Sequence, residues 1–179
     1  MHDLHGGVGG VHALAAGAAG TADFDADFLG LELEVDFLDA VNGATRPKAI
    51  PGAEALYTLT VTNSGLGSVN NNVILITDTI PANTELFVNS LGGSPAGPVT
   101  FTQGSVSSNL SFAFTSLGSI TDDVEFANSG GWGYTPVPNG AGYDPAVTQI
   151  RFNPKGKMAA WSGSGGQPSF SLGFKVRIK

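Results

Sequence analysis

The sequence contains no cysteine, which excludes disulfide bonds, thiolate metal ligands and cysteine nucleophiles. Charged residues are scarce, at 13% of the chain, against about 25% in an average soluble protein. Eight Lys and Arg residues stand against fifteen Asp and Glu, and the net charge of −7 argues against a nucleic-acid-binding surface. No apolar run reaches the ~18 residues of a membrane-spanning helix, so no membrane span is predicted.

Histidine is almost absent, and this limits the possible catalytic sites. The three histidines, His2, His5 and His12, all lie in a Gly-rich N-terminal segment. A Ser-His-Asp triad would therefore need a base from that segment. The glycines of residues 6–10 are not followed by Lys and Ser or Thr, as a phosphate-binding loop requires. We therefore predict no enzyme, no catalytic residue and no cofactor, and interpret the histidines as polar residues rather than a transition-metal site.

Alternating apolar and polar residues are the main positive signal. Within 29–37, 57–62 and 170–178, one set of alternate residues is apolar and the other is polar or glycine, which is typical of strands with one buried face. Shorter apolar runs predict further strands around 73–76, 101, 110–114 and 150–152, the first of them buried on both faces. With turn residues between these runs and no apolar stripe of helical period, the pattern predicts an all-β antiparallel sandwich. The expected core includes Tyr57, Leu59, Val61, Phe174 and Val176.

The apolar positions change parity near residue 29. They are even before it, as at Phe24 and Phe28, and odd from Leu29 onwards. Because side chains alternate between the two faces of a strand, this change predicts a bulge or bend between two units. We therefore divide the chain into a Gly/Ala-rich N-terminal arm, residues 1–28, and a β-sandwich domain, residues 29–179.

Three spaced segments carry a family resemblance. Residues 47–53 are Pro-Lys-Ala-Ile-Pro-Gly-Ala, residues 57–65 are Tyr-Thr-Leu-Thr-Val-Thr-Asn-Ser-Gly, and residues 77–81 are Thr-Asp-Thr-Ile-Pro. This arrangement resembles the "domain of unknown function eleven" repeat of bacterial and archaeal secreted surface proteins, over residues 40–179. The resemblance implies an immunoglobulin-like sandwich outside the cell, without catalytic residues. The first forty residues depart from the family pattern.

The same segments also have a physical interpretation. Pro51-Gly52 predicts a tight turn, and Asn63-Ser64-Gly65 predicts residues with positive φ that end the preceding strand. Asp78 is expected to accept a hydrogen bond from the backbone two residues further on, which would fix the turn before Pro81. These features direct folding rather than chemistry.

Acidic residues of the arm form a candidate metal site. Asp23, Asp25 and Asp27 share one face if the segment is a strand, and Ca²⁺ would relieve their mutual repulsion. The EF-hand pattern requires glycine after the third acid, where this chain has Phe28. The alternative is a solvated acidic face. A second loop site would use Asp122, Asp123 and Asp144.

Aromatic residues in Gly-rich loops suggest a sugar-binding alternative. Trp132, Tyr134, Tyr143 and Trp161 have the flat apolar faces on which sugar rings stack. Ordinary loop packing is the competing interpretation of the same residues.

The leading functional hypothesis is a structural subunit of an extracellular filament or surface array. The arm would add a strand to the sheet of an identical subunit, because strand addition relies on main-chain hydrogen bonds that any sequence can provide. The alternative is that the arm covers an edge of its own sheet. The arm residues expected at this contact are Val8, Val11, Leu14, Phe24 and Phe28. The alternatives are a non-polymerising carbohydrate- or surface-binding adhesin module and a small hydrolase.

Overall fold

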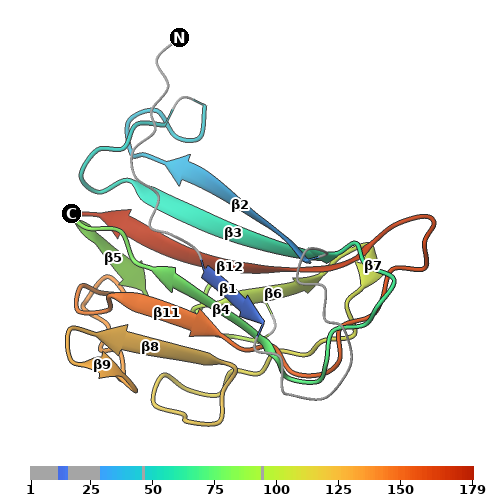
Figure 1. The fold of residues 1–179 in the computed structure, drawn as a ribbon. Helices are drawn as coiled ribbons and strands as arrows, with labels where there is room; N and C mark the ends of the chain where they lie inside the picture. The colour runs from blue at the N-terminus through green and yellow to red at the C-terminus, as the bar shows by residue number, and fades with distance from the viewer. Residues whose placement is uncertain (1–11, 16–28, 46, 94) are drawn as a thin grey trace.

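The computed structural model describes residues 12–15, 29–45, 47–93 and 95–179, which form strands and turns without a helix (Figure 1). The strands form two sheets whose side chains meet in one core, and this confirms the predicted all-β sandwich. Because the described residues form no helix, none of them spans a membrane as one.

The smaller sheet has five strands in the order β1-β4-β11-β8-β9, all antiparallel. Their bounds are β1 His12–Ala15, β4 Ile74–Thr79, β11 Gln149–Phe152, β8 Val124–Asn128 and β9 Gly131–Trp132. β1 belongs to the arm by sequence, whereas the other four strands belong to the predicted sandwich domain.

The larger sheet has seven strands, with the path β10-β5-β12-β3-β2. Their bounds are β10 Tyr143–Asp144, β5 Thr84–Phe87, β12 Pro168–Ile178, β3 Glu54–Asn63, β2 Leu29–Leu38, β6 Thr100–Gln103 and β7 Val106–Ser107. β6 and β7 both pair with β12, and the short β7–β12 pairing is the parallel one. β12 is thus the central strand of this sheet.

The predicted core is confirmed around β3 and β12. Tyr57 is 9% exposed and Phe174 is 1% exposed, and their rings stack with centroids 5.0 Å apart. Phe174 also contacts Phe152 of the smaller sheet, with ring centroids 6.0 Å apart. Leu59, Val61 and Val176 are buried as well. The aromatic contacts therefore join the two sheets as well as neighbouring strands.

The Pro51-Gly52 turn is confirmed in detail. The backbone N–H of Ala53 donates to the carbonyl of Ile50 over 2.9 Å, and Gly52 has a φ of 87°. A type II turn has proline at its second position and positive φ at its third. Glycine supplies that φ without a steric penalty, so the pair sets the chain reversal before β3.

The prediction for residues 63–65 is wrong in its mechanism. None of these three residues is among those with positive φ. Instead, the buried side chain of Asn63 donates to the carbonyls of Gly67 and Ala159 and accepts from the N–H of Gly65, over 2.8–2.9 Å. The strand ends because an amide side chain satisfies the loop backbone.

Two strand predictions also need correction. Residues 110–114 form no strand, because Asp122 and Asp123 side chains accept the N–H groups of Thr115 and Ala113 that a ladder would otherwise use. The run 73–76 is not buried on both faces. β4 begins at Ile74 and alternates, with Leu75 only half-buried, because one face of this sheet meets the core and the other faces outwards.

Candidate functional site

β2 is less covered than the strand beside it. β2 and β3 pair along their full length, with Leu33 opposite Leu59 and Val35 opposite Tyr57. Leu59 is fully buried, whereas Leu33 and Val35 are only partly buried at the margin of the core. Residues opposite each other in a sheet face the same side. The smaller sheet therefore covers the inner face of β3 and gives incomplete cover to that of β2.

The partly covered residues of β2 form a continuous set, which we call the β2 apolar row. Its members are Leu29, Leu31, Leu33, Val35 and Phe37. β2 is an end strand of the larger sheet, and β1 is an end strand of the smaller one. Figure 1 shows these two ends on the same side of the molecule.

The edge of β4 that pairs with β1 is the second part of the site, and we call it the acceptor edge. β1 runs antiparallel to it, with His12 opposite Thr77 and Ala15 opposite Ile74. A segment of the N-terminal arm thus already adds a strand to this edge within one chain. Of the predicted contact residues, Leu14 lies in β1, opposite Leu75.

The register gives the acceptor edge a distinct pattern. Ile74 and Ile76 face the core and are 5% and 0% exposed. The arm positions opposite them are Ala15 and Ala13. Small residues therefore stand opposite the two large buried residues of β4. An antiparallel strand can bind this edge through its main chain without displacing the core.

Asp78 is the unexpected residue of the acceptor edge. It continues the buried face of β4 and is only 3% exposed. Its Oδ2 is the one buried side-chain oxygen, among the described residues, that has no hydrogen-bond partner. Burial raises the pKa of Asp78 to about 6, although a hydrogen bond from the Thr79 backbone acts in the opposite direction. An unpartnered buried carboxyl requires an explanation beyond folding.

The expected turn contact of Asp78 is not formed. The N–H two residues on, at Ile80, donates to the carbonyl of Thr148 over 2.9 Å. Asp78 instead influences Tyr57 across the sandwich. The pKa of Tyr57 is raised, first by burial and second by the Asp78 charge. The two polar groups share an otherwise apolar part of the core.

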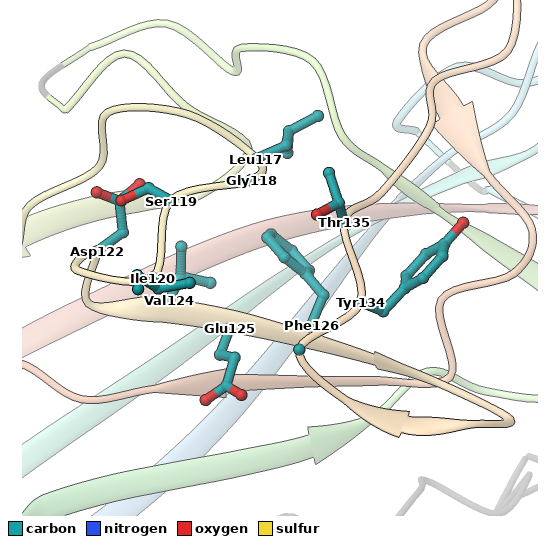
Figure 2. A pocket seen from close by; sticks show the side chains of 11 residues that line it. Leu117, Gly118, Ser119, Ile120, Asp122, Val124, Glu125, Phe126, Tyr134 and Thr135 are labelled. Atoms are coloured by element: carbon teal, nitrogen blue, oxygen red, sulfur yellow. The ribbon is translucent and has the colours of Figure 1, made fainter.

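A separate cleft of about 210 Å³ lies beside β8. Figure 2 shows Phe126 pointing into it, between the loop of Leu117 and the segment of Tyr134 and Thr135, whereas Glu125 points away. Asp122 lines the cleft, but hydrogen bonds from Thr115 and Ser116 hold its pKa low, against the effect of burial. The cleft thus has a mixed polar and apolar lining, and its Asp122 carboxylate anchors the loop that carries it.

The carboxylates proposed for a second loop site hold backbone segments in place. All three accept hydrogen bonds from nearby loop groups: Asp122 from Thr115 and Ser116, Asp123 from Ala113, and Asp144 from Tyr134, Val137 and Ala146. Across the described ranges, no three His, Asp or Glu side chains gather in a way that would hold a metal ion. These acids shape loops in the structure.

The four aromatic residues considered for sugar stacking have different environments. Tyr143 is 2% exposed and donates to Glu54, so it cannot present a face to a ligand. Trp132 is 37% exposed and carries the Arg151 guanidinium 4.2 Å above its ring. Trp161 donates to a loop carbonyl, and Tyr134 lines the cleft of Figure 2. They do not form one stacking surface.

Several sequence predictions fall outside the described residues. These are the possible calcium ligands Asp23, Asp25 and Asp27, the contact residues Val8, Val11, Phe24 and Phe28, and the bend expected at 28–29. The histidines His2 and His5 lie there as well, whereas His12 opens β1.

The sequence pattern does not identify Asp78 as a site residue, and it does not indicate that the inner face of β2 is incompletely covered. Both depend on which strand lies at the end of each sheet, which alternation alone does not reveal. The one available signal was the spacing of Asp78, which continues the alternate positions of Ile74 and Ile76 and so places a carboxylate on their buried face. Comparison with family models, with curated proteins and with solved structures gives no match.

Proposed function

We propose that this protein is a structural subunit of an extracellular filament or surface array, assembled through its N-terminal arm. The arm of one copy adds a strand to the acceptor edge of the next copy. The observation that carries this proposal is the β1–β4 pairing, in which an arm segment already fits that edge in an antiparallel register. Strand addition of this kind gains affinity from main-chain hydrogen bonds.

The sequence between β1 and β2 is long enough for exchange between copies. Thirteen residues, 16–28, separate the two strands, and an extended chain of that length spans up to roughly 45 Å. The same segment can then occupy the edge of its own chain or that of a neighbour, which is the usual basis of domain swapping. A contact between the arm of one copy and β4 of another is head-to-tail, and such contacts grow into filaments unless the ring closes.

The partial exposure of the β2 apolar row also favours assembly. Its side chains are only partly buried, and a neighbouring chain could cover them further. Burial of apolar area contributes about 25 cal/mol per Å², so completing this cover favours the assembled state. The low charge and the family resemblance agree with a location outside the cell.

A pair of variants at one arm position tests the proposal. Leu14→Pro removes a backbone N–H and is poorly tolerated within a paired strand, whereas Leu14→Val keeps the main chain intact. We expect Leu14→Pro to abolish filaments in electron micrographs and Leu14→Val to retain them. Far-ultraviolet circular dichroism should show the same strand content in both, since the sandwich core lies elsewhere.

Two outcomes would contradict the proposal. If Leu14→Pro assembles as well as Leu14→Val, the arm is not the connecting strand. If the unmodified protein is monomeric in sedimentation at every concentration tested, the proposal fails and the non-polymerising adhesin becomes the better hypothesis. Sugar binding at the exposed Trp132 would then be the next measurement.

A further inference from the structure

We propose that Asp78 makes occupancy of the acceptor edge depend on acidity, so that the edge holds the arm more firmly when Asp78 is protonated. The occupant is the arm, residues 1–28, from the same or from a neighbouring copy. The part that concerns a neighbouring copy rests on the proposed function, whereas the effect within one chain does not.

The position of Asp78 along β4 is the first argument. The described pairing of β1 covers Ile74 to Thr77 and stops one residue before Asp78. Asp78 faces inwards, as Ile74 and Ile76 do, and is almost fully buried. A strand that continued its pairing past Thr77 would run directly beside the Asp78 backbone. Asp78 therefore lies next to the last β4 position whose pairing with β1 is described.

The missing hydrogen-bond partner is the second argument. An ionised carboxylate needs donors or water around both oxygens, and Oδ2 has no donor from the described residues. Water can reach such a group more easily when the neighbouring edge is open. A strand that closes the edge removes that water, which penalises the ionised form and leaves the neutral acid largely unaffected.

Among the described residues, the Thr79 backbone N–H is the one group that favours the ionised form of Asp78, and burial outweighs it. From β3 the facing titratable group is Tyr57, a neutral phenol whose own pKa is raised by burial and by Asp78. From β11 the residue opposite is Ile150, which is apolar. Asp78 takes part in none of the ion pairs formed by the described residues. Burial raises its pKa to about 6, so it changes charge in a mildly acidic range.

Hydrogen exchange of the full-length protein tests the proposal without requiring assembly. Amide protection along β4 is compared at about pH 5 and about pH 7.5, after correction for intrinsic exchange rates. We expect the ratio of occupied to open edge to fall as the pH rises, by about tenfold for each pKa unit that separates the two states. Amides of Leu59 and Phe174, inside the paired core of the larger sheet, provide the internal reference.

Two carboxylate variants distinguish Asp78 from general charge effects. Asp78→Asn keeps the shape and removes the ionisation, so β4 protection should lose its pH dependence. Asp36→Asn removes an equally charged group from the exposed face of β2 and should behave like the unmodified protein. If Asp78→Asn keeps the full pH dependence, the proposal is overturned.

Assembly is recorded in parallel so that the two proposals can fail separately. A monomeric protein whose β4 protection still depends on Asp78 supports this inference and contradicts the proposed function. Filaments whose formation is unaffected by pH and by Asp78→Asn contradict this inference alone. If Asp78→Asn does not fold, carbon-13 resonances of the Asp78 carboxyl in the unmodified protein replace it. A midpoint that differs from that of β4 protection then overturns the proposal.

Discussion

β3 and β2 are neighbouring strands of equal length and similar alternation, yet they belong to different regions of the molecule. On β3, Leu59 is fully buried under the smaller sheet. Directly opposite on β2, Leu33 is only partly covered. The same residue type on the same face therefore has two environments one strand apart. The closed region around β3 and β12 holds the fold together. The region that we call open, β2 and the acceptor edge of β4, has a partly covered apolar row and the buried Oδ2 of Asp78, which has no partner among the described residues.

Buried polar groups differ between the two regions in the same way. Asn63, at the end of β3, makes hydrogen bonds through both atoms of its amide. Asp78, on the acceptor edge, leaves Oδ2 without a partner. A satisfied amide costs little to bury, whereas an unsatisfied carboxylate costs considerably more. The two regions therefore differ in polar satisfaction as well as in apolar cover.

The largest effect is expected from the closed region. Phe174→Ala removes a ring that is 1% exposed and contacts both Tyr57 and Phe152. We expect the free energy of unfolding to fall by about 3–5 kcal/mol, because the cavity cannot be filled by neighbours. Urea denaturation followed by tryptophan fluorescence measures it. A loss below about 1 kcal/mol would contradict the assignment of this residue to the core.

The second effect concerns Asp78 and the pH dependence of stability. Its folded-state pKa of about 6 lies above the ordinary aspartate value of 3.8. The protonated carboxyl therefore contributes stability that is fully present below about pH 3.8 and is lost as the pH rises through about 6. Asp78→Asn should raise the free energy of unfolding at neutral pH by about 2–3 kcal/mol, with no difference near pH 3. Equal stabilities of the two proteins across this range in urea titrations would contradict burial of the charge.

The smallest effect is expected for Leu33→Ala, with Leu59→Ala as its matched control. Full burial predicts a loss of about 2–5 kcal/mol for Leu59→Ala, and partial cover predicts about 1–2 kcal/mol for Leu33→Ala. Both are measured on the monomer by urea denaturation. In assembled material the cost of Leu33→Ala should increase, since a neighbour would then cover the row. Equal losses in the monomer would remove the distinction between the two regions.

The sequence was sufficient to predict the closed region. Strict alternation identified β2, β3 and β12 and the residues of the core, because one buried face forces a period of two. The Pro51-Gly52 turn was equally accessible, since its backbone requirement is local. The strand predicted at 110–114 is not formed. Carboxylates of residues seven and ten positions further along the chain accept backbone N–H groups that a neighbouring strand would otherwise accept.

The open region was much less accessible from sequence. Alternation predicts the same burial for Leu33 and Leu59. Their burial differs because the smaller sheet covers the inner face of β3 more completely than that of β2. Asp78 was interpreted as a turn residue. Which donors lie within reach of its carboxyl depends on how the two sheets pack, and the sequence does not show this. The arm was predicted to add a strand to the sheet of an identical subunit, whereas the described pairing joins β1 to β4 of the same chain. The sequence alone did not indicate that β4 offers the edge.

The central claim is that the arm of one copy binds β4 of another, and disulfide trapping tests it most directly. The sequence lacks cysteine, so single cysteines can be introduced without interference. One preparation carries His12→Cys and a second carries Thr77→Cys, at positions directly opposite in the β1–β4 register. Opposite residues of antiparallel strands lie about 4.5–5.5 Å apart at Cα, within the range that a disulfide spans.

Because each chain has one cysteine, a mixed disulfide can form only between copies. When the two preparations are assembled together and oxidised, the account predicts a mixed dimer on a non-reducing gel. Thr58→Cys, on β3 of the larger sheet, replaces Thr77→Cys in the control and should give no mixed product. Assembled material without the His12–Thr77 disulfide, or with as much of the His12–Thr58 product, would contradict strand addition at β4.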